Sequence, residues 1–338
     1  MICRTVLERI GQRFFSRKML DAADTASLKL KGVVGYNGRQ NDVIYCHPLE
    51  KSEQTTAVIY FGGDIQDFIE NMEMPAEKSS RKFSSVEEDN KHYMKWNLDH
   101  VANILGTSFP TSHIIVVRPA RMEVRTFSCF DNFVRSNTNG VPEHTPTHYA
   151  LHHLEQILKC ISDRVRTKKQ RPVDESGLED GEIMGSPEQT EWWSQDLDLD
   201  MYNLTLIGFS KGCVVLNQFI YEFHYLKTLT PGDEILSSFV DRITDMYWLD
   251  GGHSGDKNTW ITSRCLLETL SRLDIKIHVH VTPYQVRDER RAWIGTEQKM
   301  FCELLRSAGA DIVETLHFEN DTPSLQKHFQ VLTAFTMH

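Results

Sequence analysis

Short, strongly apolar runs alternate along this chain with longer amphipathic stretches. The runs rich in β-branched and aromatic residues predict strands at 57–61, 114–117, 202–208, 244–250, 275–281 and 312–318. The amphipathic stretches predict helices at 96–105, 148–165, 214–226, 260–273, 289–308 and 324–335. Strands that alternate with helices of these lengths favour an α/β fold, with a mostly parallel central sheet and helices on both faces.

The N-terminal third adds a different pattern before the first buried strand. Two strand-like runs, 28–36 and 43–47, flank a polar stretch that begins with Asn37-Gly38. An Asn-Gly between two such runs is typical of a β-hairpin. We therefore expect an antiparallel N-terminal edge on the parallel sheet.

The first nineteen residues are basic and amphipathic. They carry five Arg and Lys residues against the single acid Glu8, with apolar residues at near-helical spacing. This pattern is typical of a mitochondrial presequence, although a surface helix of a cytosolic protein has the same features. We interpret 1–26 as a targeting segment, and 27–338 as a single domain with loop insertions near 70–92, 121–146 and 167–200.

The acidic excess of the chain is confined to one of these insertions. The formal net charge is −10, from 47 acidic and 37 basic residues. Ten of the acids lie within 172–200, where there is no Lys or Arg, so the remainder is balanced. We interpret this stretch as a solvated, flexible insertion. Nucleic-acid binding is not expected, because it needs a clustered basic face.

The cysteine spacing and the hydropathy exclude further classes of protein. The seven cysteines are scattered and never spaced as C-x-x-C, which argues against a disulfide framework and a cysteine-rich zinc site. No apolar run approaches the roughly 20 residues of a membrane-spanning helix. We expect no transmembrane segment and no cofactor.

A G-x-S-x-G sequence lies between the strand at 202–208 and the helix at 214–226. It reads Gly208-Phe209-Ser210-Lys211-Gly212. In a nucleophile elbow the serine occupies a strained turn between a strand and a helix, so that its hydroxyl projects from the end of the sheet. The glycines are needed because a Cβ would crowd the facing backbone. The pattern and its context predict an α/β-hydrolase fold with Ser210 as nucleophile.

A glycine loop follows the early strand at 57–61. Its sequence is Gly62-Gly63-Asp64, at the strand end where an α/β-hydrolase supplies one N–H of its oxyanion hole. The residue after the nucleophile supplies the other, here Lys211. We therefore expect Gly62, Gly63, Asp64 and Lys211 to form the oxyanion hole.

The partners of Ser210 should follow it in the order acid, then histidine. Asp288 and Asp250 both qualify as the acid by position. We prefer Asp288, because the usual acid follows the later strand and Asp250 could instead brace the glycine turn beside it. For the base we prefer His328, at the start of the last helix, with His317 and His253 as alternates.

Two further histidines suggest a metal site only weakly. His278 and His280 alternate on one face of a predicted strand. No third ligand is apparent, and a pair of satisfied sheet histidines explains them better. We expect no metal.

Several stretches resemble a single orphan family. They are 207–218 around the elbow, 246–255, 280–288, 61–66, 127–134 and His328-Phe329. They closely resemble the mitochondrial α/β-hydrolase-like family named for an open reading frame on chromosome 2, over about residues 57–335. That family has a proline where Gly62 stands, and a variable polar insertion where this chain has its acidic one. A weaker similarity extends to the lipid-droplet-associated serine hydrolases.

The resemblance implies a mitochondrial location, with the matrix preferred and the cytosol as the alternative, and a serine-hydrolase-like fold. Together with the residues it predicts a hydrolase of acyl esters or thioesters, with a lipid-like or small acyl substrate. The alternative is a catalytically idle hydrolase fold that serves as a binding or scaffolding protein, with a protein partner.

Overall fold

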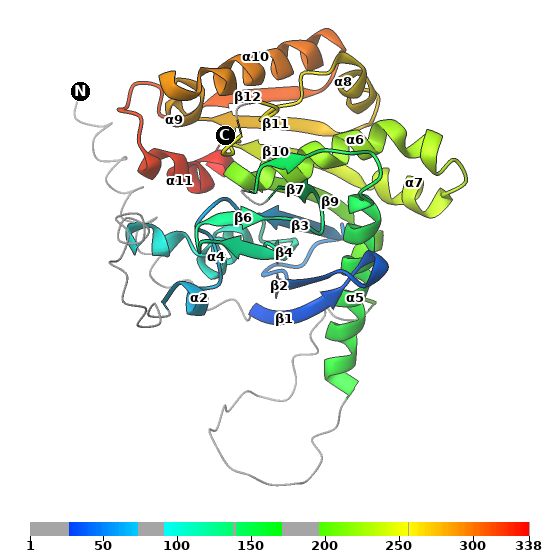
Figure 1. Ribbon diagram of the computed structural model, residues 1–338. Helices are drawn as coiled ribbons and strands as arrows, with labels where there is room; N and C mark the ends of the chain where they lie inside the picture. The colour runs from blue at the N-terminus through cyan, green and yellow to red at the C-terminus, as the bar shows by residue number, and fades with distance from the viewer. Residues whose placement is uncertain (1–26, 74–90, 138–139, 171–195, 256, 338) are drawn as a thin grey trace, which may run out of the picture.

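An eight-stranded sheet forms the centre of the molecule. The computed structural model describes residues 27–73, 91–137, 140–170, 196–255 and 257–337 (Figure 1). The strand order is β1-β2-β4-β3-β9-β10-β11-β12, and Figure 1 shows them from β1 at the bottom of the view to β12 near the top. Their bounds are β1 (Ser27–Val34), β2 (Gln40–Cys46), β3 (Thr56–Phe61), β4 (His113–Val117), β9 (Asn203–Phe209), β10 (Ile243–Leu249), β11 (Lys276–Val281) and β12 (Ile312–Leu316).

The pairing confirms the predicted α/β architecture. β1 pairs with β2, and β2 with β4, in the antiparallel sense, whereas every other neighbouring pair in this sheet is parallel. The turn after β1 uses the Asn-Gly dipeptide, since Asn37 and Gly38 have φ angles of 55° and 74°. The antiparallel N-terminal edge is therefore confirmed. The fold is that of the α/β-hydrolases.

Helices cover both faces of the sheet. Their bounds are α2 (Ile69–Glu73), α4 (Leu98–Ser108), α5 (Ala150–Gln170), α6 (Cys213–Leu229), α7 (Glu234–Val240), α8 (Arg264–Leu270), α9 (Pro283–Val286), α10 (Ala292–Ser307) and α11 (Leu325–Ala334). One buried apolar cluster joins the sheet to α5, α6, α7, α8 and α10, and a second joins it to α4 and α11. The strands alternate between the two clusters: Leu206 of β9 belongs to the first, and Ile207 to the second.

Most predicted elements are present, but two helices differ from their predictions. The helix predicted at 260–273 is only Arg264–Leu270. The N–H groups of Thr259 and Trp260 donate to the Glu297 carboxylate, and the stretch up to Ser263 is a loop. The helix predicted at 289–308 is split into a 3-10 turn, η6 (Glu289–Arg291), and α10. The short helices α2, α7 and α9 were not predicted, and α2 occupies the start of the loop expected at 70–92.

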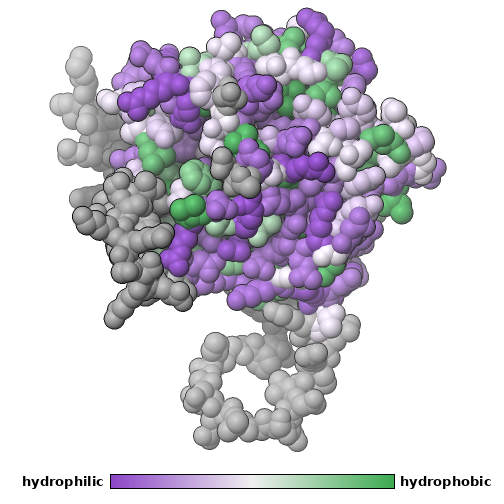
Figure 2. Space-filling view, viewed as in Figure 1, coloured by the Kyte–Doolittle hydropathy of each residue, from purple (hydrophilic) through white to green (hydrophobic). Residues whose placement is uncertain are grey.

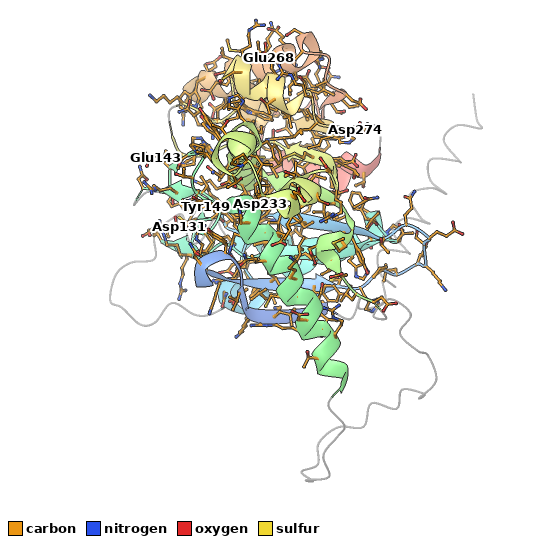
Figure 3. The ribbon with its side chains drawn as sticks, turned by 90° about the vertical axis from the view of Figure 1, so that its right-hand side faces the viewer. Asp131, Glu143, Tyr149, Asp233, Glu268 and Asp274 are labelled. Carbon is orange, nitrogen blue, oxygen red and sulfur yellow. The ribbon has the colours of Figure 1, made fainter. Side chains whose placement is uncertain are left out.

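The stretch 121–146 contains two small hairpins. They are β5 (Arg121–Glu123) with β6 (Phe127–Cys129), and β7 (Arg135–Ser136) with β8 (Pro142–Glu143). The Asp131 carboxylate joins them, since it accepts from Arg121 Nε at 2.6 Å and from the Ser136 hydroxyl. Figure 3 labels Asp131 and Glu143 along one side of the molecule.

The predictions for 1–26, for most of 70–92 and for most of the acidic insertion lie outside the described residues. In the part of the chain that the structure describes, none of the helices combines the length and apolarity needed to cross a membrane. The face shown in Figure 2 is largely hydrophilic, and hydrophobic residues are scattered over it in small groups.

Candidate active site

Ser210 lies in a tight turn between β9 and α6. Its φ angle is 51°, in the left-handed region that residues other than glycine rarely adopt. The motif's glycines make the turn possible. A Cβ on Gly212 would lie 2.0 Å from the Phe61 carbonyl oxygen, and one on Gly208 would lie 2.8 Å from Cys213 Cα. The sequence therefore forms the strained strand-to-helix turn of a nucleophile elbow.

Asp250 occupies the equivalent position on the neighbouring strand. Leu249 of β10 pairs with Phe209 of β9, so Ser210 and Asp250 are the first residues beyond one pair in the register. The Asp250 φ angle is 47°. A hydrogen bond from Gly252 N–H to the Ser210 carbonyl oxygen, at 3.3 Å, joins the two turns. Two residues with strained backbones therefore lie next to each other at the carboxyl ends of β9 and β10.

His328 is bound to Asp250. The distance from His328 Nδ1 to Asp250 Oδ2 is 2.7 Å, and both side chains are buried. A carboxylate can only accept, so the proton of this hydrogen bond is on Nδ1. Thr282 supplies the other two hydrogen bonds: its N–H donates to Oδ1 at 2.7 Å and its hydroxyl to Oδ2 at 2.6 Å. The carboxylate is therefore fixed by three donors from two further elements.

Aromatic rings hold the imidazole between them. The Phe209 ring centroid lies 4.6 Å from that of His328, and the Tyr284 centroid lies 5.2 Å from it. Phe209 directly precedes Ser210. The packing therefore places the His328 ring beside the elbow with its Nδ1 edge on Asp250.

Asp288 is engaged elsewhere. Its carboxylate accepts from Arg290 N–H at 2.9 Å and from Arg291 Nε at 2.8 Å. The hydrogen bond from Arg291 holds the pKa of Asp288 below its usual value. Asp288 is the N-cap of η6, and the structure pairs His328 with Asp250 rather than with Asp288. We therefore replace Asp288 with Asp250 in the proposal below.

The other candidate histidines have different partners. His253 Nδ1 accepts from Gly255 N–H at 2.9 Å, within its own loop. His317 lies just after β12, with Nε2 at 2.8 Å from His280 Nδ1. His278 Nε2 lies 2.9 Å from Asp245 Oδ1. The H-x-H pair therefore contacts two separate partners, and the described residues contain no group of three His, Cys, Asp or Glu able to hold a metal ion.

The glycine loop after β3 lies against Ser210. A Cβ on Gly63 would lie 2.8 Å from Ser210 Cβ. The Gly63 N–H, however, donates to Gln66 Oε1 at 2.8 Å. Gln66 also accepts from the Tyr60 hydroxyl at 2.8 Å, and its Nε2 donates to the Trp96 carbonyl oxygen at 2.7 Å. Gln66 thus fixes the loop and uses the Gly63 N–H that the sequence assigned to the oxyanion hole.

A second support for the loop comes from β6. Ser128 Oγ donates to the Gly63 carbonyl oxygen at 2.6 Å, and Ser128 N–H donates to Asp64 Oδ1 at 2.8 Å. Sequence reasoning assigned no role to Gln66, Ser128 or Thr282. All three lie in stretches that resemble the family, and that resemblance was the only available signal.

Lys211 is buried beside the serine. Its Nζ donates to the Gly140 carbonyl oxygen. Burial lowers the pKa of Lys211, and the nearby Asp64 opposes this change. Burial raises the pKa of Asp64, against the effect of Lys211 and of the Ser128 N–H. Lys211, the residue after Ser210, and Asp64 are therefore an acid and a base that each offset the effect of burial on the other's pKa.

A family model described as C2orf69 matches residues 29–188 and 174–311. The chain belongs to this family. The mouse mitochondrial protein C2orf69 homolog is 37% identical over 306 residues, covering 85% of this chain and 80% of its own. The zebrafish homolog is 34% identical over 327 residues, covering 93% and 87%. The human mitochondrial protein C2orf69 is 37% identical over 299 residues, covering 82% and 74%.

Solved structures similar to this C2orf69 family member include esterases. A Pyrobaculum calidifontis esterase is 12% identical, with a TM-score of 0.45, and the match covers 99% of this chain and 92% of that one. Brefeldin A esterase is 11% identical, with a TM-score of 0.43 and coverages of 98% and 81%.

Proposed function

We propose that this protein is a serine hydrolase that cleaves an acyl ester or thioester through Ser210, His328 and Asp250. The observation that carries the proposal is the buried His328–Asp250 hydrogen bond at 2.7 Å, beside a strained serine on the adjoining strand end. A histidine base oriented by a carboxylate is what a serine needs to act as a nucleophile.

In the proposed reaction, Ser210 Oγ attacks the carbonyl carbon while His328 Nε2 takes the hydroxyl proton. Asp250 stabilises the imidazolium, which then donates the proton to the departing alkoxide or thiolate. Water, activated by His328, releases the acid from the acyl-enzyme. Asp250 accepts three hydrogen bonds, and the one from His328 fixes the Nδ1–H tautomer, so that Nε2 is the nitrogen that can take the serine proton.

The oxyanion would be held by the backbone N–H groups of Lys211 and Asp64. Gly63 contributes space rather than a donor, because its N–H donates to Gln66 and a side chain at this position would press on Ser210. The oxyanion hole therefore still includes the predicted Gly62-Gly63-Asp64 loop, but only the Asp64 N–H of that loop acts as a donor.

Turnover of a panel of p-nitrophenyl esters and acyl thioesters tests the proposal. We expect hydrolysis by the wild type, and a loss of about 10⁴-fold or more in Ser210→Ala. Activity that persists in Ser210→Ala at the wild-type rate would refute Ser210 as nucleophile.

The alternative is an idle hydrolase fold that binds a partner in mitochondria. One observation favours it: the Asp64 carboxylate belongs to the oxyanion loop, where a negative charge opposes the developing oxyanion. Under this alternative, neither the wild type nor Ser210→Ala hydrolyses any ester or thioester of the panel.

We propose a mitochondrial location, in the matrix. The basic amphipathic N-terminus supports it, as do the names of the mouse, zebrafish and human relatives. N-terminal sequencing of the protein from fractionated mitochondria should find a shortened chain. Recovery of the protein in the cytosolic fraction with Met1 intact would contradict this location.

A further inference from the structure

Asp64 follows the residue that touches the nucleophile. Gly63 lies so close to Ser210 that its Cβ would be 2.8 Å from the serine's, and Asp64 is the next residue of the loop. The Asp64 carboxylate lies close enough to Lys211 and His328 for both to act on it, so we place it beside the acyl group whose oxyanion we assign to the Asp64 N–H.

The Asp64 carboxylate is held at one oxygen. Oδ1 accepts from Ser128 N–H at 2.8 Å, which fixes the side chain against β6. The side chain is enclosed enough for burial to raise its pKa, yet it keeps partial exposure to solvent. A carboxylate that is bound through one oxygen and partly exposed has a second oxygen that can accept a hydrogen bond from a ligand.

The charges around Asp64 oppose one another. Lys211 and His328 are the two cationic or protonatable groups that act on it. The Lys211 ammonium donates to Gly140 and is itself buried. Asp64 and Lys211 together carry no net charge when both are ionised. The selection of a substrate at this point therefore depends on hydrogen bonding more than on long-range attraction.

A plain hydrocarbon chain fits poorly against such a pair. It would remove water from an ionised carboxylate without replacing the lost hydrogen bonds. A hydroxyl or N–H on the substrate replaces them, and sites built for such a donor reject analogues that lack it.

Resting on the hydrolase function proposed above, we propose that Asp64 is a specificity-determining residue. Its Oδ2 accepts a hydrogen bond from a hydroxyl or amide N–H on the acyl group, close to the scissile carbonyl. The substrate class is therefore short, polar acyl esters or thioesters rather than plain fatty acyl ones.

Matched thioesters test this selection. The N-acetylcysteamine thioesters of 3-hydroxybutyrate, butyrate and dodecanoate differ only in the acyl group. We expect the wild type to favour 3-hydroxybutyryl over butyryl by about tenfold or more in kcat/KM, with dodecanoyl slowest. Asp64→Ala should bring the first ratio close to one. Asp64→Asn should keep part of it, because the amide oxygen still accepts.

A matched control keeps the charge change away from the site. Glu303 on α10 is an exposed carboxylate paired with Lys299, and Glu303→Gln should leave the ratio at its wild-type value. Thermal unfolding of each variant separates a loss of selection from a loss of the fold.

Binding to Ser210→Ala separates this inference from the hydrolase proposal. This variant should bind the 3-hydroxybutyryl thioester about tenfold more tightly than the butyryl one, and Ser210→Ala/Asp64→Ala should bind both equally. Equal binding by Ser210→Ala, or a preference that survives Asp64→Ala, overturns the role of Asp64. An intact binding preference without Ser210-dependent turnover refutes the hydrolase function alone.

Discussion

Ser210 and Asp250 share an unusual backbone conformation at adjacent strand ends. Their φ angles of 51° and 47° cost about 1–3 kcal/mol each for residues other than glycine. Such strain persists only where the surrounding structure fixes it. Here the glycines of the elbow and the three hydrogen bonds to Asp250 do so.

Thr282 tests whether the orientation of Asp250 matters for the proposed reaction. Thr282→Val keeps the side-chain volume and the N–H bond to Asp250 but removes the hydroxyl that donates to Oδ2. A buried hydrogen bond to a charged group contributes about 1.5–3 kcal/mol. We expect kcat to fall about tenfold, with KM little changed, in assays of the preferred ester. Wild-type kcat in this variant would show that the hydroxyl does not position the acid.

At the scale of single elements, close packing between the elbow and β3 decides the geometry. Gly212→Ala places a Cβ 2.0 Å from the Phe61 carbonyl oxygen, a contact that only a backbone shift can relieve. We expect a loss of about 3 kcal/mol or more in the free energy of unfolding. Denaturant titration measures it.

Gly232 is the matched control for Gly212. A Cβ added there meets nothing within 4 Å, so Gly232→Ala should change the free energy of unfolding by less than about 1 kcal/mol. Equal stability of the two variants would refute the close approach of the elbow to β3.

Local sequence patterns were enough to predict most of the strands and helices, and the tight turn at Ser210. Strand and helix periodicity depends on neighbouring residues, and the G-x-S-x-G pattern reports a local turn. The choice between Asp250 and Asp288 was different, because it depends on the register of Leu249 with Phe209 and on donors from Thr282. Asp288 instead caps η6, a local role that the sequence allowed equally well.

Contacts between distant segments account for the rest of what was missed. Gln66 reaches Trp96, and Ser128 reaches Gly63, across 30 and 65 residues of chain. Glu297 binds the N–H group of Thr259, 38 residues away, in the loop that replaces the start of the helix predicted at 260–273. Such contacts have no signature in the sequence pattern of either partner.

At the scale of the whole molecule, buried neutral histidines should make the fold sensitive to acid. Burial lowers the pKa of His113 and of His153 to about 3. In the unfolded chain both titrate near 6.5. Below that pH the unfolded state binds more protons, so the stability present above about pH 6.5 is lost as the pH falls toward 3.

Together, the two histidines should lower the free energy of unfolding by about 3 kcal/mol for each pH unit below 6.5. The melting temperature, measured between pH 7.5 and 4.5, should fall steeply below pH 6.5. His113→Asn should be less stable at pH 7.5, because Tyr45 loses its partner, and should show a shallower fall. A melting temperature independent of pH from 6.5 to 5 would contradict the burial of neutral histidines.

The central claim is that Ser210 is a nucleophile activated by His328 and oriented by Asp250. Intact-mass spectrometry after treatment with a fluorophosphonate tests it most directly, because attack by serine on phosphorus displaces fluoride and leaves a permanent mass increase. We expect one adduct on the wild type and on Asp288→Asn, none on Ser210→Ala, and labelling slowed about 10³-fold or more on Asp250→Asn. Equal labelling rates in Asp250→Asn and the wild type, or no adduct on the folded wild type, would contradict the claim.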